Sequence, residues 1–170
     1  SFNVAPAGGT VRLRPPGTPD FLPVREEDLV PMRSEVDATR GRIELRTARD
    51  GSGAQQVASA FDGLFVVRQA SATQAFSTLR LPSLGGCPVP RSRARSGPRA
   101  RMAAQGSKRK RQRKRRRRGP SRSLWVRDNG GRWRSATGSV SAAAIGTLWK
   151  TTLTCDGVRV TVREGRVRVR

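Results

Sequence analysis

The feature that most constrains the fold is a basic segment that divides the chain. Between residues 88 and 122 there are sixteen Lys or Arg residues and no Asp or Glu, and subtracting sixteen from the formal net charge of +23 leaves +7 for the rest of the chain. Like charges at this density repel one another, and the segment has too few apolar side chains to offset the entropy lost on ordering it. The sequence therefore predicts that residues 87–122 form a long disordered loop.

The sequence on both sides of this loop alternates apolar and polar residues. In residues 10–14, Val11 and Leu13 share one face and the intervening arginines share the other. A period of two is typical of β-strands, and no window of about a dozen residues shows a convincing helical period of 3.6. Short strands separated by turn residues favour an all-β fold, either a small sandwich or a rolled antiparallel sheet. Strands are expected within residues 10–14, 42–46, 64–67, 76–81, 124–126, 139–145, 147–155, 158–162 and 166–170.

Turn residues predict two hairpins. The Asp-Asn-Gly-Gly sequence at 128–131 follows one strand and precedes Trp133, and Glu164-Gly165 separates two strictly alternating runs. No apolar run approaches the roughly 20 residues that cross a bilayer. We expect one interrupted β-domain, with a flexible N-terminus at 1–9, a first part at 10–86, the basic loop at 87–122 and a second part at 123–170.

Two cysteines, Cys87 and Cys155, are the only thiols, and no histidine is present to complete a zinc site with them. Both lie beside apolar, strand-like sequence, which favours a disulfide between them. The alternative is a pair of unpaired, buried thiols in a cytosolic protein. A disulfide would close a loop of about 68 residues, contribute roughly 4 kcal/mol in the chain-entropy treatment, and require an oxidising compartment.

Most side chains used in catalysis are missing. The chain has no histidine and no tyrosine, which removes the commonest general base and any Ser-His or Cys-His nucleophile pair. The acidic cluster at 26–28 is either a cation or acid–base site or a solvated turn. No glycine cluster has the sequence of a phosphate-binding loop. We expect no enzymatic activity, no cofactor and no metal site. Asp residues that precede Gly or Asn-Gly, where turn geometry favours them, are Asp50, Asp62, Asp128 and Asp156.

The densest part of the basic segment carries ten cations in the eleven positions 108–118. Such a run attracts nucleic acid, anionic lipid or an acidic cell-wall polymer by releasing counterions. It contains no aromatic residue for base stacking, so binding would be non-specific; the alternative is a solvated insert without a partner. The candidate polyanion-binding residues are Lys108, Arg109, Lys110, Arg111, Arg113, Lys114, Arg115, Arg116, Arg117 and Arg118.

The three tryptophans, Trp125, Trp133 and Trp149, all follow the basic segment. Buried tryptophans fill a sheet interface, whereas exposed ones on strands form platforms that bind carbohydrate. Core positions are the favoured interpretation. Trp125 is the best candidate for exposure, because Leu124 and Val126 share the opposite face of their strand.

Residues 16–48 resemble the FecR-like β-domain, whose strand pair has the pattern matched by DATRGRIEL at 37–45. The wider chain resembles hypothetical exported proteins of actinobacteria that carry a basic low-complexity insert, with GTLW at 146–149 and CDG at 155–157. The resemblance implies an extracytoplasmic, non-enzymatic β-domain and supports the disulfide. We therefore expect a structural, sensory or interaction module of a bacterial surface or secreted protein, with an unknown protein or a cell-surface polymer as its partner. Polyanion binding through the basic loop is the alternative function.

Overall fold

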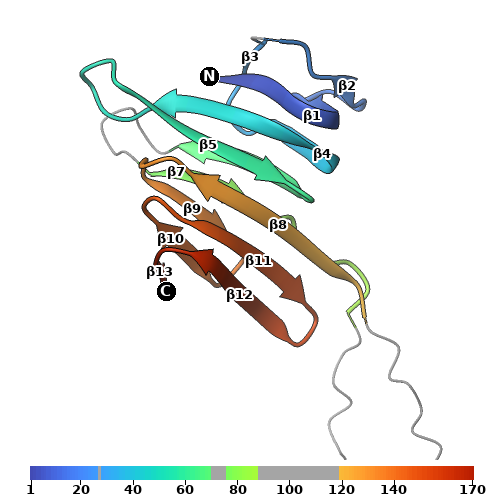
Figure 1. The fold of residues 1–170 in the computed structure, drawn as a ribbon. Helices are drawn as coiled ribbons and strands as arrows, with labels where there is room; N and C mark the ends of the chain where they lie inside the picture. The colour runs from blue at the N-terminus through green and yellow to red at the C-terminus, as the bar shows by residue number, and fades with distance from the viewer. Residues whose placement is uncertain (27, 70–75, 88–118) are drawn as a thin grey trace, which may run out of the picture.

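The computed structural model describes residues 1–26, 28–69, 76–87 and 119–170 (Figure 1). Within these ranges the chain contains thirteen strands and no helix, which confirms the all-β prediction and leaves no helix there that could span a membrane. The strands are β1 (Phe2–Arg14), β2 (Leu22–Pro23), β3 (Asp28–Val30), β4 (Glu35–Ala48), β5 (Gln55–Phe61), β6 (Leu64–Gln69), β7 (Ser77–Arg80), β8 (Ser121–Asp128), β9 (Trp133–Ala136), β10 (Ser141–Ala144), β11 (Leu148–Thr154), β12 (Gly157–Glu164) and β13 (Val167–Val169).

The strands form one sheet that folds over into a sandwich. Its order is β12-β11-β8-β5-β4-β6-β7-β9-β10-β13, with β1 beside β4 and the short strands β2 and β3 beside β1. All pairs are antiparallel except β7–β9. Figure 1 shows β4, β5, β8, β11 and β12 in a front layer and β7, β9, β10 and β13 behind it. Because β12 and β13 stand at opposite ends of the order and follow one another in the chain, the sheet is nearly closed.

Strand β4 carries the chain from one layer to the other. Its first residues, 35–37, pair with β6, whereas residues 42–48 pair with β5. Strand β1 follows it along both halves, with irregular register between Pro6 and Gly8 and between Thr10 and Arg12. The two layers are therefore joined through a bend within a single strand.

The core lies between the layers and follows the alternation expected from the sequence. In β8, Leu124 and Val126 are fully buried while Trp125 between them is only partly covered. Trp133 and Trp149 are the largest buried side chains, and both have no exposed surface. The alternating residues of β4, β6 and β7 enclose the same core.

Two features of the chain differ from the expectations. Residues 1–9 are not a flexible N-terminus, because β1 begins at Phe2 and the side chains of Phe2 and Val4 are each only 2% exposed. Burial of these two side chains offsets the entropy of ordering the segment. The predicted loop at 87–122 also ends too late, because β8 begins at Ser121 and pairs with β11. Residues 88–118 of that loop lie outside the described residues.

Neither predicted hairpin forms. The turn at 128–131 connects β8, which pairs with β5 and β11, to β9, which pairs with β7 and β10. The turn at Glu164-Gly165 connects β12, which pairs with β11, to β13, which pairs with β10. Each turn therefore connects a strand of one layer to a strand of the other. The strands of each layer present one apolar face to the shared core and pair within their own layer, so the strands on either side of these turns do not pair with each other.

Candidate functional site

Cys87 and Cys155 are joined by a disulfide, with their Cα atoms 5.4 Å apart, which confirms the predicted pair. Gly119 lies against the same bond, since a Cβ added to it would be 3.2 Å from Sγ of Cys155. Cys87 and Gly119, the described residues that flank 88–118, therefore both lie at Cys155. The ten cationic residues at 108–118 themselves lie outside the described residues.

The candidate acidic residues that the structure describes lie in turns or at the ends of strands. Asp28 accepts a hydrogen bond from the backbone N–H of Arg25 at 2.8 Å, and its neighbour Glu27 lies outside the described residues. Asp50 accepts hydrogen bonds from the backbone and hydroxyl of Ser52, which lower its pKa. Asp62 adopts a left-handed conformation with φ of 55° in the turn between β5 and β6. Asp156 is exposed in the β11–β12 turn.

Asp128 is the most buried of these carboxylates, at 3% exposed. It accepts hydrogen bonds from the backbone N–H groups of Gly131 at 2.6 Å and Gly146 at 2.9 Å, and thereby joins the β8–β9 and β10–β11 connections. Burial raises its pKa above the ordinary value, against the effect of these hydrogen bonds. Among the described residues, no three Cys, Asp or Glu side chains lie close enough together to hold a metal ion.

Trp125 is the one tryptophan outside the core, as the strand pattern predicts, and it belongs to a row of side chains on the outer face of the front layer. The row follows the strand register: Arg42 of β4 lies opposite Phe61 of β5, Phe61 opposite Trp125 of β8, and Trp125 opposite Lys150 of β11. Each of these residues alternates with a buried core residue. All four side chains therefore project to the same outer surface.

Ring and cation contacts connect the row. The rings of Phe61 and Trp125 stack with centroids 6.0 Å apart and planes 8° from parallel. The Arg42 guanidinium lies 4.5 Å from the Phe61 centroid, and the Lys150 ammonium lies 5.6 Å from the Trp125 ring. Arg163, the extra residue in a β12 bulge, places its guanidinium 5.2 Å from the same ring. We call Arg42, Phe61, Trp125, Lys150 and Arg163 the aromatic–cation row.

The row presents positive charge rather than flat rings to solvent. Each ring is stacked with its neighbour and has a guanidinium within 5.2 Å of its centroid, so cations share the space that a sugar or a base would need for stacking. Within the described part of the chain, ion pairs use Arg12, Arg14, Arg46 and Arg127, and none uses a cation of the row. The arrangement is therefore suited to holding an anion.

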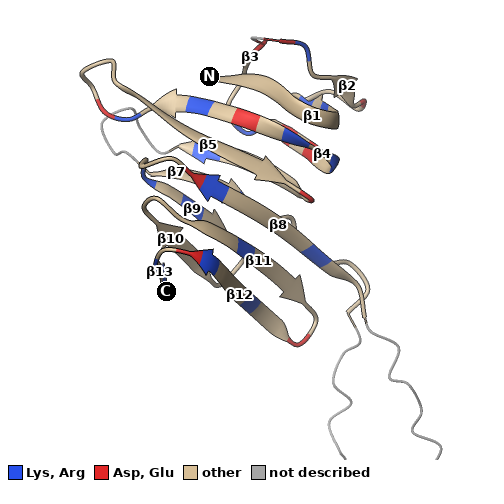
Figure 2. Cartoon of the chain, viewed as in Figure 1, with Lys and Arg blue, Asp and Glu red and all other residues tan. Residues whose placement is uncertain are grey.

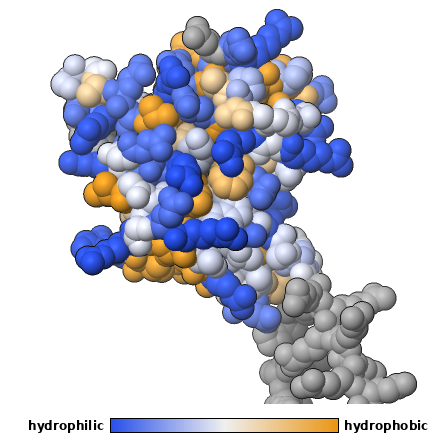
Figure 3. Space-filling view, viewed as in Figure 1, coloured by the Kyte–Doolittle hydropathy of each residue, from blue (hydrophilic) through white to orange (hydrophobic). Residues whose placement is uncertain are grey.

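The surroundings of the row are also basic. Figure 2 shows Lys and Arg on β4, β8, β11 and β12 of this layer, with Asp and Glu on β4 and near strand ends. Figure 3 shows hydrophilic side chains over most of the same view. At one side Arg127 pairs with Glu164 at 3.2 Å, and at another Arg46 pairs with Glu44 at 2.7 Å. Cations outnumber carboxylates around the stacked rings.

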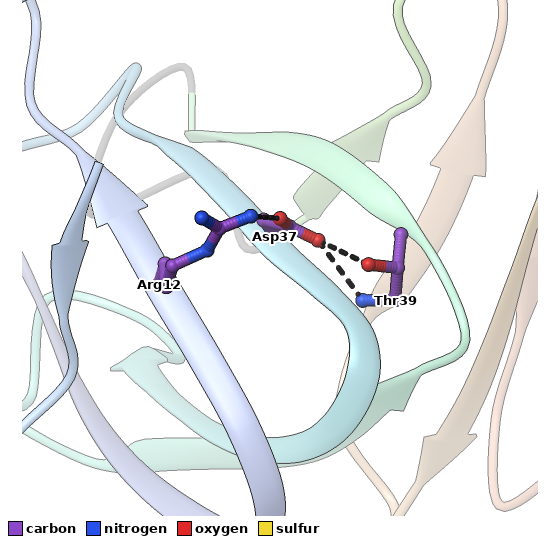
Figure 4. A network of polar contacts seen from close by, with 3 residues as sticks. All are labelled: Arg12, Asp37 and Thr39. Atoms are coloured by element: carbon purple, nitrogen blue, oxygen red, sulfur yellow. Dashed lines mark hydrogen bonds and ion pairs between the residues drawn. The ribbon is translucent and has the colours of Figure 1, made fainter. Parts of the chain in front are cut away.

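The residues that carry the family resemblance build the bend in β4. Asp37 accepts hydrogen bonds from the Arg12 guanidinium at 2.7 Å and from the Thr39 hydroxyl at 2.6 Å (Figure 4). Burial acts to raise the pKa of Asp37, but the hydrogen bonds from Thr39 and Arg12 together lower it. At Gly41, a Cβ would lie 2.7 Å from the carbonyl oxygen of Thr10, so the two strands cross at a contact that only glycine permits. This motif has a structural role.

Sequence reasoning identified Trp125 but missed Arg42, Phe61, Lys150 and Arg163. Phe61 was missed because no strand was predicted at β5. The cations were missed because alternation shows which residues share a face of one strand but not which residues lie opposite them on the neighbouring strand. The one sequence signal that could have identified Phe61 is its position directly before the Asp62-Gly63 turn, where a strand would end. No family model matches the chain, and neither a curated protein nor a solved structure shows significant similarity to it. Fold and site define a disulfide-linked, all-β domain with a basic outer face.

Proposed function

We propose that this chain is a non-enzymatic interaction module of an exported bacterial protein, and that its aromatic–cation row holds an acidic cell-surface polymer. The observation that carries the proposal is the alignment of Arg42, Phe61, Trp125 and Lys150 across four neighbouring strands. With strands about 4.8 Å apart, the two end cations are roughly 14 Å from one another. A linear polymer with repeated negative charges can meet both ends of the row at once.

The stacked rings set the positions of the cations. A cation over an aromatic ring is attracted by the ring's quadrupole, by about 0.5–1 kcal/mol at an exposed site. Arg42 and Arg163 therefore lose less freedom on binding than isolated surface arginines would. Since the rings stack on each other and cations lie over them, recognition rests on charge spacing more than on the base stacking that single-stranded nucleic acids require.

Two observations support a location outside the cytoplasm. The Cys87–Cys155 disulfide persists in oxidising compartments, and the resemblance of residues 16–48 to the FecR-like β-domain points the same way. Within the 37–45 motif, Asp37, Thr39 and Gly41 have a structural role at the bend of β4. The proposal therefore takes up the domain type and assigns binding to the aromatic–cation row, to which the motif contributes Arg42.

A second candidate function is polyanion binding through residues 108–118. It is favoured by one specific observation: Cys87 and Gly119, the described residues that flank the basic segment, both lie at Cys155, close to Ser121 at the start of β8. Trp125 is four residues further along that strand, a distance of about 13 Å. A polymer that extends along β8 from the row reaches the residues that flank the basic segment.

The test separates the two functions with four proteins made in the full chain. They are the wild type, a row variant (Arg42→Ala, Lys150→Ala, Arg163→Ala), a segment variant with the ten cations of 108–118 replaced by Gly or Ser, and the combination. A charge-matched control replaces three exposed arginines elsewhere: Arg25, Arg49 and Arg132. Binding of dextran sulfate, with uncharged dextran as the reference polymer, is measured by calorimetry over a range of salt concentrations.

In the segment variant, the row substitutions should weaken binding at least tenfold and lower the salt slope by about two to three, because about one counterion is released for each cation that meets the polymer. The control substitutions should change affinity less than twofold beyond their effect on net charge. If the segment variant does not bind, or if row and control substitutions act equally, the row does not hold the polymer. Loss of all binding in the segment variant alone would assign the function to residues 108–118.

A further inference from the structure

The back layer carries a second basic site, on the face of the molecule opposite the aromatic–cation row. It is a cavity of ≈ 450 Å³ that four arginines line, namely Arg33, Arg68, Arg80 and Arg134. Three adjacent strands supply its floor: Arg68 of β6 lies opposite Thr78 of β7, which lies opposite Arg134 of β9. Arg80 stands two residues along β7 from Thr78, and Arg33 comes from the β3–β4 connection.

The positions of these arginines are fixed by the fold. Val67, Leu79, Trp133 and Ser135 alternate with them along the strands and are fully buried, so the arginines must project outward. Nε of Arg134 donates a hydrogen bond to the Thr78 hydroxyl at 2.6 Å, and the same guanidinium lies 5.8 Å from the centroid of the Phe76 ring, so two contacts hold it.

Arg33 enters the site from a constrained backbone. Its φ is 72°, a left-handed conformation that is unfavourable for a residue other than glycine. Its backbone N–H donates to the carbonyl oxygen of Val67 at 2.9 Å, which joins the β3–β4 connection to β6. The guanidinium of Arg33 is thus brought to the cavity by an ordered connection.

The charge of the cavity is uncompensated by the described residues. No Asp or Glu lines it, and the ion pairs formed within the described part of the chain use other arginines. Glu27 is the only acidic residue of the sequence outside the described ranges. Four cations around one cavity repel one another, and a bound anion removes that repulsion.

We infer that this arginine pocket binds a small organic molecule that carries a multiply charged oxyanion group. Planar guanidinium groups form paired hydrogen bonds with phosphate and carboxylate oxygens alike. The cavity has the size of small-molecule sites, which are commonly 300–1,000 Å³, and so has room for more than the anionic group. Met32 and Ala136 supply apolar contact for the remainder of the molecule, and Thr137 and Gln69 supply polar atoms.

The inference does not depend on polymer binding at the row, because the two sites share no residue. Its test uses the full chain with pyrophosphate, inorganic phosphate, citrate and chloride as probes at matched ionic strength. The pocket variant is Arg68→Ala with Arg80→Ala. The charge-matched control is Arg166→Ala with Arg168→Ala, two exposed positions at the C-terminal end. Affinity and stoichiometry are measured by calorimetry, and the site by backbone amide chemical shifts in ¹H–¹⁵N spectra.

Pyrophosphate, citrate or both should bind with one-to-one stoichiometry and shift the amides of Thr78, Thr137 and Gly138, whereas chloride should not. The pocket variant should bind at least tenfold more weakly and the control less than twofold more weakly. Arg68→Lys with Arg80→Lys keeps the charge but loses the paired geometry, and should give an intermediate loss. Preference for pyrophosphate assigns a phosphate-bearing ligand, and preference for citrate a polycarboxylate. Absence of saturable binding, or equal losses in the pocket and control variants, would overturn the inference.

Discussion

Removal of the disulfide, by Cys87→Ser with Cys155→Ser, should cost about 4 kcal/mol of unfolding free energy. The bond closes a loop of 68 residues, and the chain-entropy relation gives roughly 4.4 kcal/mol for a loop of that length at 25 °C. Packing adds little to this value, because Cys87 is exposed and Cys155 only partly buried, so that serine hydroxyls at both positions stay close to water. The effect acts through the unfolded chain, which gains freedom once the bond is absent.

Urea denaturation followed by tryptophan fluorescence measures this difference. With a slope m of about 2 kcal/mol/M, a loss of 4 kcal/mol lowers the midpoint by about 2 M, and m itself should rise because the unlinked unfolded chain exposes more surface. Wild-type protein reduced with dithiothreitol should match the serine variant. Thiol labelling of the unreduced, denatured wild type should find no free cysteine. A change below about 1 kcal/mol, or two free thiols, would refute the reasoning.

Three further perturbations test the fold. Asp37→Asn should lower the unfolding free energy by about 1 kcal/mol at neutral pH. Because the folded pKa of Asp37 lies below its ordinary value of 3.8, this stability difference should be constant above about pH 5 and shrink as pH falls below about 4. Acid titrations of both proteins, followed by circular dichroism, measure it. Gly41→Ala should cost about 2–3 kcal/mol in urea, since its Cβ would lie 2.7 Å from backbone, whereas Gly85→Ala, with open space around it, should stay within about 0.5 kcal/mol. Raising NaCl from about 20 to 200 mM should raise the melting temperature, because salt screens the repulsion among the surface cations. A lower melting temperature would mean that salt weakens stabilising surface ion pairs more than it weakens this repulsion.

The strands that could be predicted from sequence are those with large apolar residues on the inner face. In β12 the partly buried side chains are Val158 and Val160, and in β8 Leu124 and Val126 are buried on either side of the partly buried Trp125. Strand β5 reverses this pattern, since Gln56, Ala58 and Ala60 face the core while Val57 and Phe61 face outward. A strand whose small residues are buried has no alternation of hydrophobicity that sequence reasoning can detect.

Strand pairing was the less predictable part of the fold. Local turn residues at 128–131 and at Glu164-Gly165 indicate a change of direction but carry no information about the layer in which the next strand lies. Gly165 is needed for a different reason, because a Cβ there would lie 2.1 Å from the Thr147 side chain. Since the aromatic–cation row exists only through the pairing of β4, β5, β8 and β11, missing that pairing also meant missing most of the candidate site.

The surplus of positive charge couples the stability of this domain to its ligands. Among the described residues, the carboxylates that form ion pairs neutralise cations near strand ends and at the β4 bend, as with Asp37 and Arg12, and none of them pairs with a cation of the row or of the arginine pocket. Repulsion among those cations disfavours the compact state. The disulfide offsets this cost by acting on the unfolded chain, without placing a carboxylate on either surface. An anion that binds only the folded domain then adds stability in proportion to the logarithm of its concentration above the dissociation constant. The same cations that weaken the free domain therefore stabilise the bound one.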